Sequence, residues 1–80
     1  MTMANRVLLY GKPGCHLCDD ALVTIKRVCD DLAVGFRQVD ISQDAKLMNE
    51  YGEQIPVTFV DGRQHDYWRV DEARLRKALG

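Results

Sequence analysis

The sequence lacks a long run of apolar residues and a concentration of charge of either sign. It has 11 basic and 12 acidic residues, a formal net charge of -1, and no run of like charge longer than two residues. Because phosphate backbones are bound by concentrated basic surfaces, nucleic acid is excluded as a main partner. The longest apolar run, Val7 to Tyr10, is far too short to span a membrane or to form a signal-peptide core. We therefore expect a cytoplasmic chain with no membrane partner.

Proline is also scarce, with 2 Pro and 6 Gly among 46% hydrophobic and 29% charged residues. This composition excludes disordered, collagen-like and low-complexity proteins. The 80 residues are about half of the ~150 that make a typical domain, so residues 1–80 should form a single domain. Its core must be thin, and we expect every large apolar side chain to lie in it. Residues 1–5 carry no pattern and should be loosely ordered, and nothing in the sequence demands more than a monomer.

Cysteine occurs only 3 times, an odd number that cannot pair completely within one chain. Cys15 and Cys18 are three residues apart. In a reducing compartment this spacing indicates redox chemistry or metal binding rather than a structural disulfide. Cys29 lies about 16 Å further along the same predicted helix, out of reach of Cys18, and we expect it to be a core residue.

Hydrophobic periodicity predicts a strand, a long helix and a second strand in the first half of the chain. Residues 6–10 form an apolar run that ends at the turn-forming residues 11–14. From Cys15 to Leu32, apolar residues recur at helical spacing and charged residues occupy the outer face. Residues 34–40 have a weaker strand pattern, because Gly and polar residues interrupt it.

The second half is predicted to contain a short helix, a β-hairpin and a last helix. Ser42 is the expected cap of the short helix. Residues 57–60 are rich in β-branched and aromatic residues, and the following Asp61-Gly62 pair is a strong hairpin signal. Asp71 should cap the last helix.

The resulting element order is β-α-β-α-β-β-α, which predicts an α/β fold. Helical crossovers join parallel strands, whereas a two-residue turn joins antiparallel strands. The sequence therefore predicts a mixed four-stranded sheet flanked by helices.

The most specific signal is Cys15-His16-Leu17-Cys18, which opens the long helix directly after a strand and a glycine-containing turn. Unpaired N–H groups at a helix start favour an anion, and the thiolate is the reactive form of cysteine. We therefore assign Cys15 as the nucleophile. Cys18, about one helical turn further on, can reach its sulfur and acts as the resolving thiol. The alternative is that both cysteines are small core residues.

His16 is a candidate for tuning this pair. If it is charged, it stabilises the reduced thiolate and makes the disulfide more oxidising. The alternative is an exposed histidine that has no role.

Four segments together resemble a known family: Tyr10-Gly11-Lys12, Cys15-His16-Leu17-Cys18, Ile55-Pro56-Val57 and Asp61-Gly62. From Val7 to Leu79 the chain resembles small glutaredoxin-like proteins of the thioredoxin superfamily. The resemblance implies a thioredoxin-like fold, with Cys15 as the attacking cysteine and Cys18 as the resolving cysteine.

The resemblance also implies substrate-binding residues outside the motif. Ile55–Pro56 matches a cis-proline bond, at which backbone groups of Ile55 pair with the peptide of the bound thiol. Lys12 matches a lysine that holds a carboxylate of glutathione, although a solvated turn lysine is the alternative. Asp71 is the counterpart of an aspartate that grips the γ-glutamyl end of glutathione.

The chain departs from the family between the hairpin and the last helix. Glutaredoxins carry a Gly-Gly pair there, whereas this chain has Tyr67-Trp68-Arg69-Val70. Side chains at these positions remove the room for close backbone approach, which argues against tight glutathione binding. The partner is then a protein disulfide or another small thiol. We expect Trp68 to be a packed aromatic residue rather than a binding platform, and Arg69 to be a solvated charge rather than a carboxylate clamp.

The leading hypothesis is a thiol–disulfide oxidoreductase that reduces protein or small-molecule disulfides with Cys15 and Cys18. It requires no cofactor and has no metal site, and glutathione or a thioredoxin-type protein would be the reductant. The alternative is a metal or [2Fe-2S] binding module that uses Cys15 and Cys18 across a dimer, with small-molecule thiols completing the cluster, because one chain offers too few ligands. A third hypothesis is an interaction domain in which the cysteines are incidental.

Overall fold

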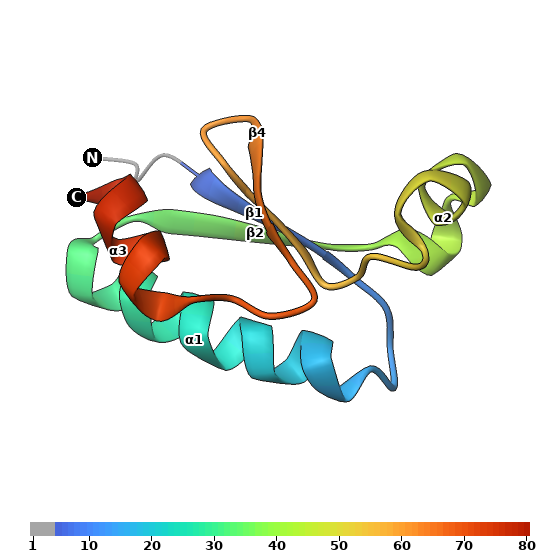
Figure 1. Ribbon diagram of the computed structural model, residues 1–80, viewed down its shortest axis with the longest axis horizontal. Coiled ribbons are helices and arrows are strands. Elements are labelled where there is room, and N and C mark those ends of the chain that lie inside the picture. Colours follow the sequence, from blue (N-terminus) through green and yellow to red (C-terminus); the bar gives the residue numbers. More distant parts are fainter. Residues whose placement is uncertain (1–4) are drawn as a thin grey trace.

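The computed structural model describes residues 5–80, and within them it shows four strands, three α-helices and one 3-10 helix (Figure 1). In chain order the elements are β1 (Asn5–Gly11), α1 (His16–Leu32), β2 (Gly35–Asp40), η1 (Ile41–Gln43), α2 (Ala45–Tyr51), β3 (Val57–Val60), β4 (Arg63–Tyr67) and α3 (Glu72–Leu79). This order confirms the predicted β-α-β-α-β-β-α sequence of elements. Of the expected loose start, residue 5 belongs to β1, and residues 1–4 lie outside the described part of the chain.

The strands form one mixed sheet in the order β2-β1-β3-β4. Strands β1 and β2 are parallel, as the α1 crossover between them requires, and the β1–β3 and β3–β4 pairs are antiparallel. In Figure 1, α1 and α3 lie together on one side of the sheet, and α2 lies beyond the ends of the strands. The predicted four-stranded α/β fold is confirmed.

The β3–β4 hairpin turns at Asp61 and Gly62, as predicted. Both residues have positive φ, 52° and 82°, the combination that a two-residue type I′ turn requires. The Arg6 guanidinium of β1 donates to both Asp61 carboxylate oxygens, at 2.9 and 2.8 Å. The turn is therefore tied to the central strand as well as closing the hairpin.

The main core lies between the sheet and the helices α1 and α3. It is built from Val7 and Leu9 of β1, Ile25 and Val28 of α1, and Leu75 of α3, with at most 1% of each residue exposed. Burial of one such side chain stabilises the fold by about 1.5–3 kcal/mol. Cys29 belongs to the same cluster, which confirms it as a core residue.

A second, smaller cluster lies at the end of the sheet where α1 begins. Its buried members are Cys18, Ile41, Ile55 and Val57, and half-buried Cys15 packs against it. Residues from distant parts of the chain, including both motif cysteines, therefore meet at this edge.

The predicted cap of the short helix is wrong by two residues. Ser42 lies inside η1, where its N–H and hydroxyl donate to Asp40 Oδ1 at 2.9 and 2.6 Å. The N-cap of α2 is Asp44, which accepts from the N–H groups of Lys46 and Leu47 at 3.0 and 3.2 Å. Both Ser and Asp are good capping residues. Ser42 is part of the 3-10 turn, so the α-helix begins only after Asp44.

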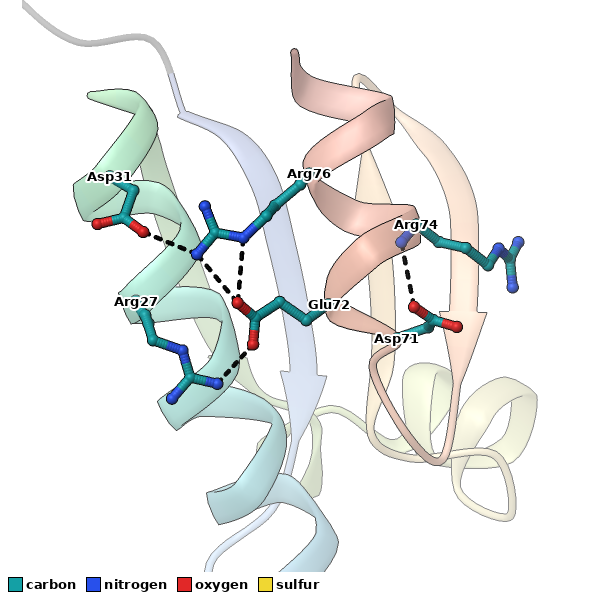
Figure 2. Close-up of polar contacts among 6 residues, drawn as sticks. All are labelled: Arg27, Asp31, Asp71, Glu72, Arg74 and Arg76. Atoms are coloured by element: carbon teal, nitrogen blue, oxygen red, sulfur yellow. Dashed lines mark hydrogen bonds and ion pairs between the residues drawn. The ribbon is translucent and has the colours of Figure 1, made fainter.

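An ion-pair network joins the exposed sides of α1 and α3 (Figure 2). The Arg76 guanidinium lies between Asp31, at 2.7 Å, and Glu72, at 2.9 Å. Glu72 also accepts from Arg27 at 2.6 Å. Single surface pairs contribute little, but a network that crosses two helices fixes how they dock.

Candidate active site

Cys15 occupies the N-cap position of α1, immediately after the turn at Gly14. Its Sγ accepts a hydrogen bond from the N–H of Cys18 at 3.3 Å. Gly14 has a φ of 79°, a conformation that glycine adopts without strain, and it directs the chain from β1 into the helix. The half-buried sulfur thus faces the positive end of the helix, where a thiolate is stabilised.

Cys18 lies in a different environment one turn further on. Only 4% of the residue is exposed, and burial, reinforced by its hydrogen bond with Cys15, raises the pKa of the Cys18 thiol to about 11. The Lys12 backbone N–H acts in the opposite direction. At neutral pH the Cys18 thiol therefore keeps its proton.

Gly11, the last residue of β1, is a site residue that the sequence alone did not identify. A Cβ at this position would lie 3.0 Å from Cys18 Sγ and 3.2 Å from Cys18 Cβ, which is tighter than most Cβ contacts in proteins. The strand backbone therefore runs directly against the Cys18 side chain. A glycine at the end of a strand pattern is a sign of such close approach, but the sequence does not say which residue approaches.

The loop before β3 completes this edge of the sheet. The Ile55–Pro56 peptide bond is cis, as the resemblance implied. Ile55 is buried in the small cluster that holds Cys18. Within residues 5–80, neither the N–H nor the C=O of Ile55 takes part in a backbone hydrogen bond, whereas the Pro56 carbonyl accepts from the Trp68 N–H at 2.8 Å.

A known family matches this chain. A model of the Glutaredoxin-like domain (DUF836) matches residues 6–80. The chain belongs to this glutaredoxin-like family. The match begins inside β1 and covers all the later helices and strands.

Several known proteins are similar to this chain in sequence or in fold. An uncharacterised protein of Mycobacterium tuberculosis is 33% identical over 76 residues, which cover 89% of this chain and 78% of that protein. The solved structure of a structural-genomics target from X. campestris has a TM-score of 0.76 and 38% identity, with 91% of this chain and 93% of that one covered. A thioredoxin variant from Halobacterium salinarum has a TM-score of 0.61 at 22% identity, covering 94% and 73% of the two chains. The thioredoxin-like fold is therefore confirmed.

Lys12 precedes the two cysteines of this glutaredoxin-like chain and His16 lies between them in the sequence, and both residues are exposed. Lys12 lines a small hollow together with Gly11 and Cys18, on the β2 side of the motif. In the described part of the chain, the Lys12 side chain forms no hydrogen bond or ion pair. Its ammonium is thus available to a ligand, and its role and that of His16 stay predictions.

Asp71 caps α3, as predicted. Its Oδ1 accepts from the Arg74 N–H at 3.1 Å, and its own N–H donates to Asp66 Oδ2 at 3.3 Å (Figure 2 shows the cap). Asp71 lines a hollow with Leu17 of the motif, whereas Lys12 lines a different hollow with Cys18. The two residues that the resemblance assigns to glutathione therefore do not share one hollow.

The prediction that every large apolar side chain lies in the core is wrong, and Trp68 is one of the exceptions. Trp68 is 52% exposed, and its ring meets Tyr67 edge-on, with the ring centroids 5.1 Å apart. It has a φ of 64°, and its indole N–H donates to the Glu53 carbonyl at 3.0 Å. The backbone and the indole N–H are therefore fixed, while half of the side chain faces solvent. Arg69 is exposed, as expected.

One chain of this glutaredoxin-like protein has too few clustered ligands for a metal ion in its described part. Among residues 5–80, no group of three or more His, Cys, Asp or Glu side chains lies close enough together to hold an ion. A cluster built on Cys15 and Cys18 would need its other ligands from a second chain or from small thiols. This alternative stays a hypothesis.

Transmembrane helices can be assessed only over the described residues. None of the helices in residues 5–80 is both long enough and apolar enough to cross a bilayer.

Proposed function

We propose that this glutaredoxin-like chain is a thiol–disulfide oxidoreductase that uses Cys15 and Cys18 as its redox couple. The observation that supports it most strongly is the unequal placement of the two sulfurs. Cys15 Sγ is half-buried at a helix N-cap and accepts from the Cys18 N–H at 3.3 Å, whereas the Cys18 thiol is buried against Gly11. This placement suits Cys15 to the first attack and Cys18 to the second.

The reaction has two sulfur exchanges. In the first, Cys15 thiolate attacks a substrate disulfide, so that a Cys15–substrate S–S bond forms and the other substrate sulfur leaves as a thiolate. In the second, Cys18 loses its proton and attacks Cys15 Sγ, which forms the Cys15–Cys18 disulfide and releases the second substrate sulfur. The substrate gains two electrons and two protons, and the protein loses them.

A thiol reductant must then return the protein to the dithiol state. Two glutathione molecules, which leave as glutathione disulfide, or one dithiol protein of thioredoxin type supply the two electrons. Lys12 and Asp71 are the candidates for contact with glutathione. Trp68 and Arg69 occupy the positions at which glutaredoxins carry two glycines. Their side chains favour a reductant or substrate that does not need close approach to the backbone.

Ile55 and Pro56 are proposed to orient the substrate. The N–H and C=O of Ile55 have no backbone partner, and Ile55 packs in the cluster against which Cys15 lies. An extended segment on either side of a substrate sulfur would supply those two hydrogen bonds. Such pairing is the same main-chain recognition that strands use at a sheet edge.

The proposal is tested by equilibrating the purified protein in a series of glutathione redox buffers and measuring its mass and thiol count. We expect the wild type to lose two hydrogens, at a midpoint near the ~-200 to -230 mV of glutaredoxins. Cys29→Ala is the matched control and should titrate in the same way, because Cys29 is a core residue far along α1. Failure of Cys15 and Cys18 to oxidise anywhere in the series would contradict the proposal.

A further inference from the structure

Three large apolar side chains, one in the motif and two where β4 ends, lie outside the core. Leu17, Tyr67 and Trp68 are 38%, 52% and 52% exposed, and they line one surface hollow of ≈ 660 Å³. A domain of this size has a thin core and few apolar residues to spare. A cluster of exposed apolar residues on such a domain marks an interaction surface.

This hollow borders the motif at Leu17 and is connected to the cis-proline loop through Trp68. Leu17 lies between the two cysteines in the sequence and forms one wall. Trp68 forms another wall and is attached to the cis-proline loop, because its backbone N–H donates to the Pro56 carbonyl at 2.8 Å and its indole N–H to the Glu53 carbonyl at 3.0 Å. A molecule whose sulfur reaches Cys15 would therefore lie next to these side chains.

Two basic side chains line the hollow, and only one of them has a carboxylate partner. Arg74 lies 3.6 Å from Asp66, and the Asp71 carboxylate accepts the backbone N–H of Arg74 as the α3 cap. Within residues 5–80, Arg69 has no carboxylate at ion-pair distance. The Arg69 guanidinium is thus the basic group in this hollow that lacks a carboxylate partner.

We propose that this surface selects protein disulfides in which the reactive cysteine is flanked by a bulky apolar residue and an acidic residue. The apolar side chain lies on Trp68 and Leu17, the acidic side chain pairs with Arg69, and the backbone of the segment pairs with Ile55. This inference rests on the proposed function and names its substrate class. The sulfur exchanges and their electron balance are those given above.

The test uses two synthetic peptides that each contain one internal disulfide. One cysteine is flanked by Phe and Glu in the acidic peptide and by Phe and Lys in the basic peptide. Pre-reduced full-length protein is mixed with each peptide in excess, without added reductant, and the rate at which Cys15 and Cys18 oxidise is followed by acid quenching and mass. A parallel reaction of the wild type with bis(2-hydroxyethyl) disulfide, a neutral small substrate, shows whether the protein reduces disulfides at all.

We expect the wild type to oxidise about two- to fivefold faster with the acidic peptide, the range for one exposed ion pair. Arg69→Glu should reverse the preference, and 1 M salt should abolish it. Arg63→Glu makes the same charge change at the other end of β4, and it should keep the wild-type preference. Trp68→Asn, which tolerates a positive φ, should slow the reaction with both peptides.

Three results would overturn the inference. The first is equal rates for both peptides in a wild type that reduces the neutral disulfide. The second is a rate loss in Arg69→Glu for oxidised glutathione alone, which would make the occupant a small anionic thiol. The third is self-association that Arg69→Glu abolishes, which would make a second copy of the chain the occupant of the hollow. If the wild type does not oxidise with the neutral disulfide either, the proposed function itself fails.

Discussion

At the scale of the residue, two cysteines three positions apart have opposite environments. Cys15 lies at the N-cap of α1, where the Cys18 N–H donates to its sulfur. Cys18 is buried, which raises its pKa to about 11. Because only thiolates attack disulfides, this difference orders the two exchange steps. It also makes the identity of the first nucleophile measurable.

Alkylation should therefore be selective. Below its pKa a thiol is protonated, so at pH 7 only about one Cys18 in ten thousand is a thiolate, and this fraction rises tenfold with each pH unit. We expect iodoacetamide to modify Cys15 first and Cys18 only as the pH approaches 11, as mapped by mass spectrometry of proteolytic fragments. Cys29, whose pKa is also raised by burial, is an internal control that should react only after unfolding in urea. Equal modification of Cys15 and Cys18 at neutral pH would contradict the assignment.

The contact between Gly11 and Cys18 leads to a second prediction at this scale. Gly11→Ala would place a methyl group 3.0 Å from Cys18 Sγ, so the sulfur must move. We expect a loss of about 1–3 kcal/mol in the free energy of unfolding, measured by urea denaturation. The Cys15–Cys18 disulfide should also close more slowly. Asn49→Ala, on the exposed side of α2, serves as the control. A Gly11→Ala protein with wild-type stability and closure rate would show that the close packing is not needed.

At the scale of the element, α3 is held to α1 by ion pairs as well as by Leu75 and Leu79. Glu72 accepts from Arg27 and Arg76, and these hydrogen bonds lower the pKa of its carboxyl. A carboxylate with a lowered pKa stabilises the fold at pH values above its unfolded pKa. That stabilisation is lost as the pH falls through the folded pKa.

Glu72→Gln should accordingly lower the resistance of the protein to urea at pH 7, by more at low ionic strength than at high. The difference from wild type should shrink as the pH falls through the folded pKa of Glu72, because the carboxyl then becomes protonated in both states. Glu53→Gln removes an exposed carboxylate that makes no ion pair within residues 5–80, and should have no such effect. A pH-independent difference between Glu72→Gln and wild type would mean that the network does not act through charge.

At the scale of the whole molecule, the fold could be predicted because its signals are local. The Asp61-Gly62 pair specifies its turn through two positive φ values, and the periodicity of α1 specifies a helix whose one face is buried. The exposure of Trp68 could not be predicted, since it depends on where the loop after β4 meets Pro56 and Glu53. The Gly11–Cys18 contact likewise depends on how a strand and a helix pack.

The site as a whole depends on Cys15 being the sulfur that meets the substrate. The most direct measurement is to incubate Cys18→Ser and Cys15→Ser separately with oxidised glutathione and with a peptide disulfide, and to locate the mixed disulfide by mass spectrometry. We expect Cys18→Ser to accumulate a mixed disulfide at Cys15 because the resolving thiol is gone. Cys15→Ser should accumulate none at neutral pH, because Cys18 is buried and protonated. A mixed disulfide at Cys18, or none in either variant, would contradict the assignment of Cys15 as nucleophile and Cys18 as resolving thiol.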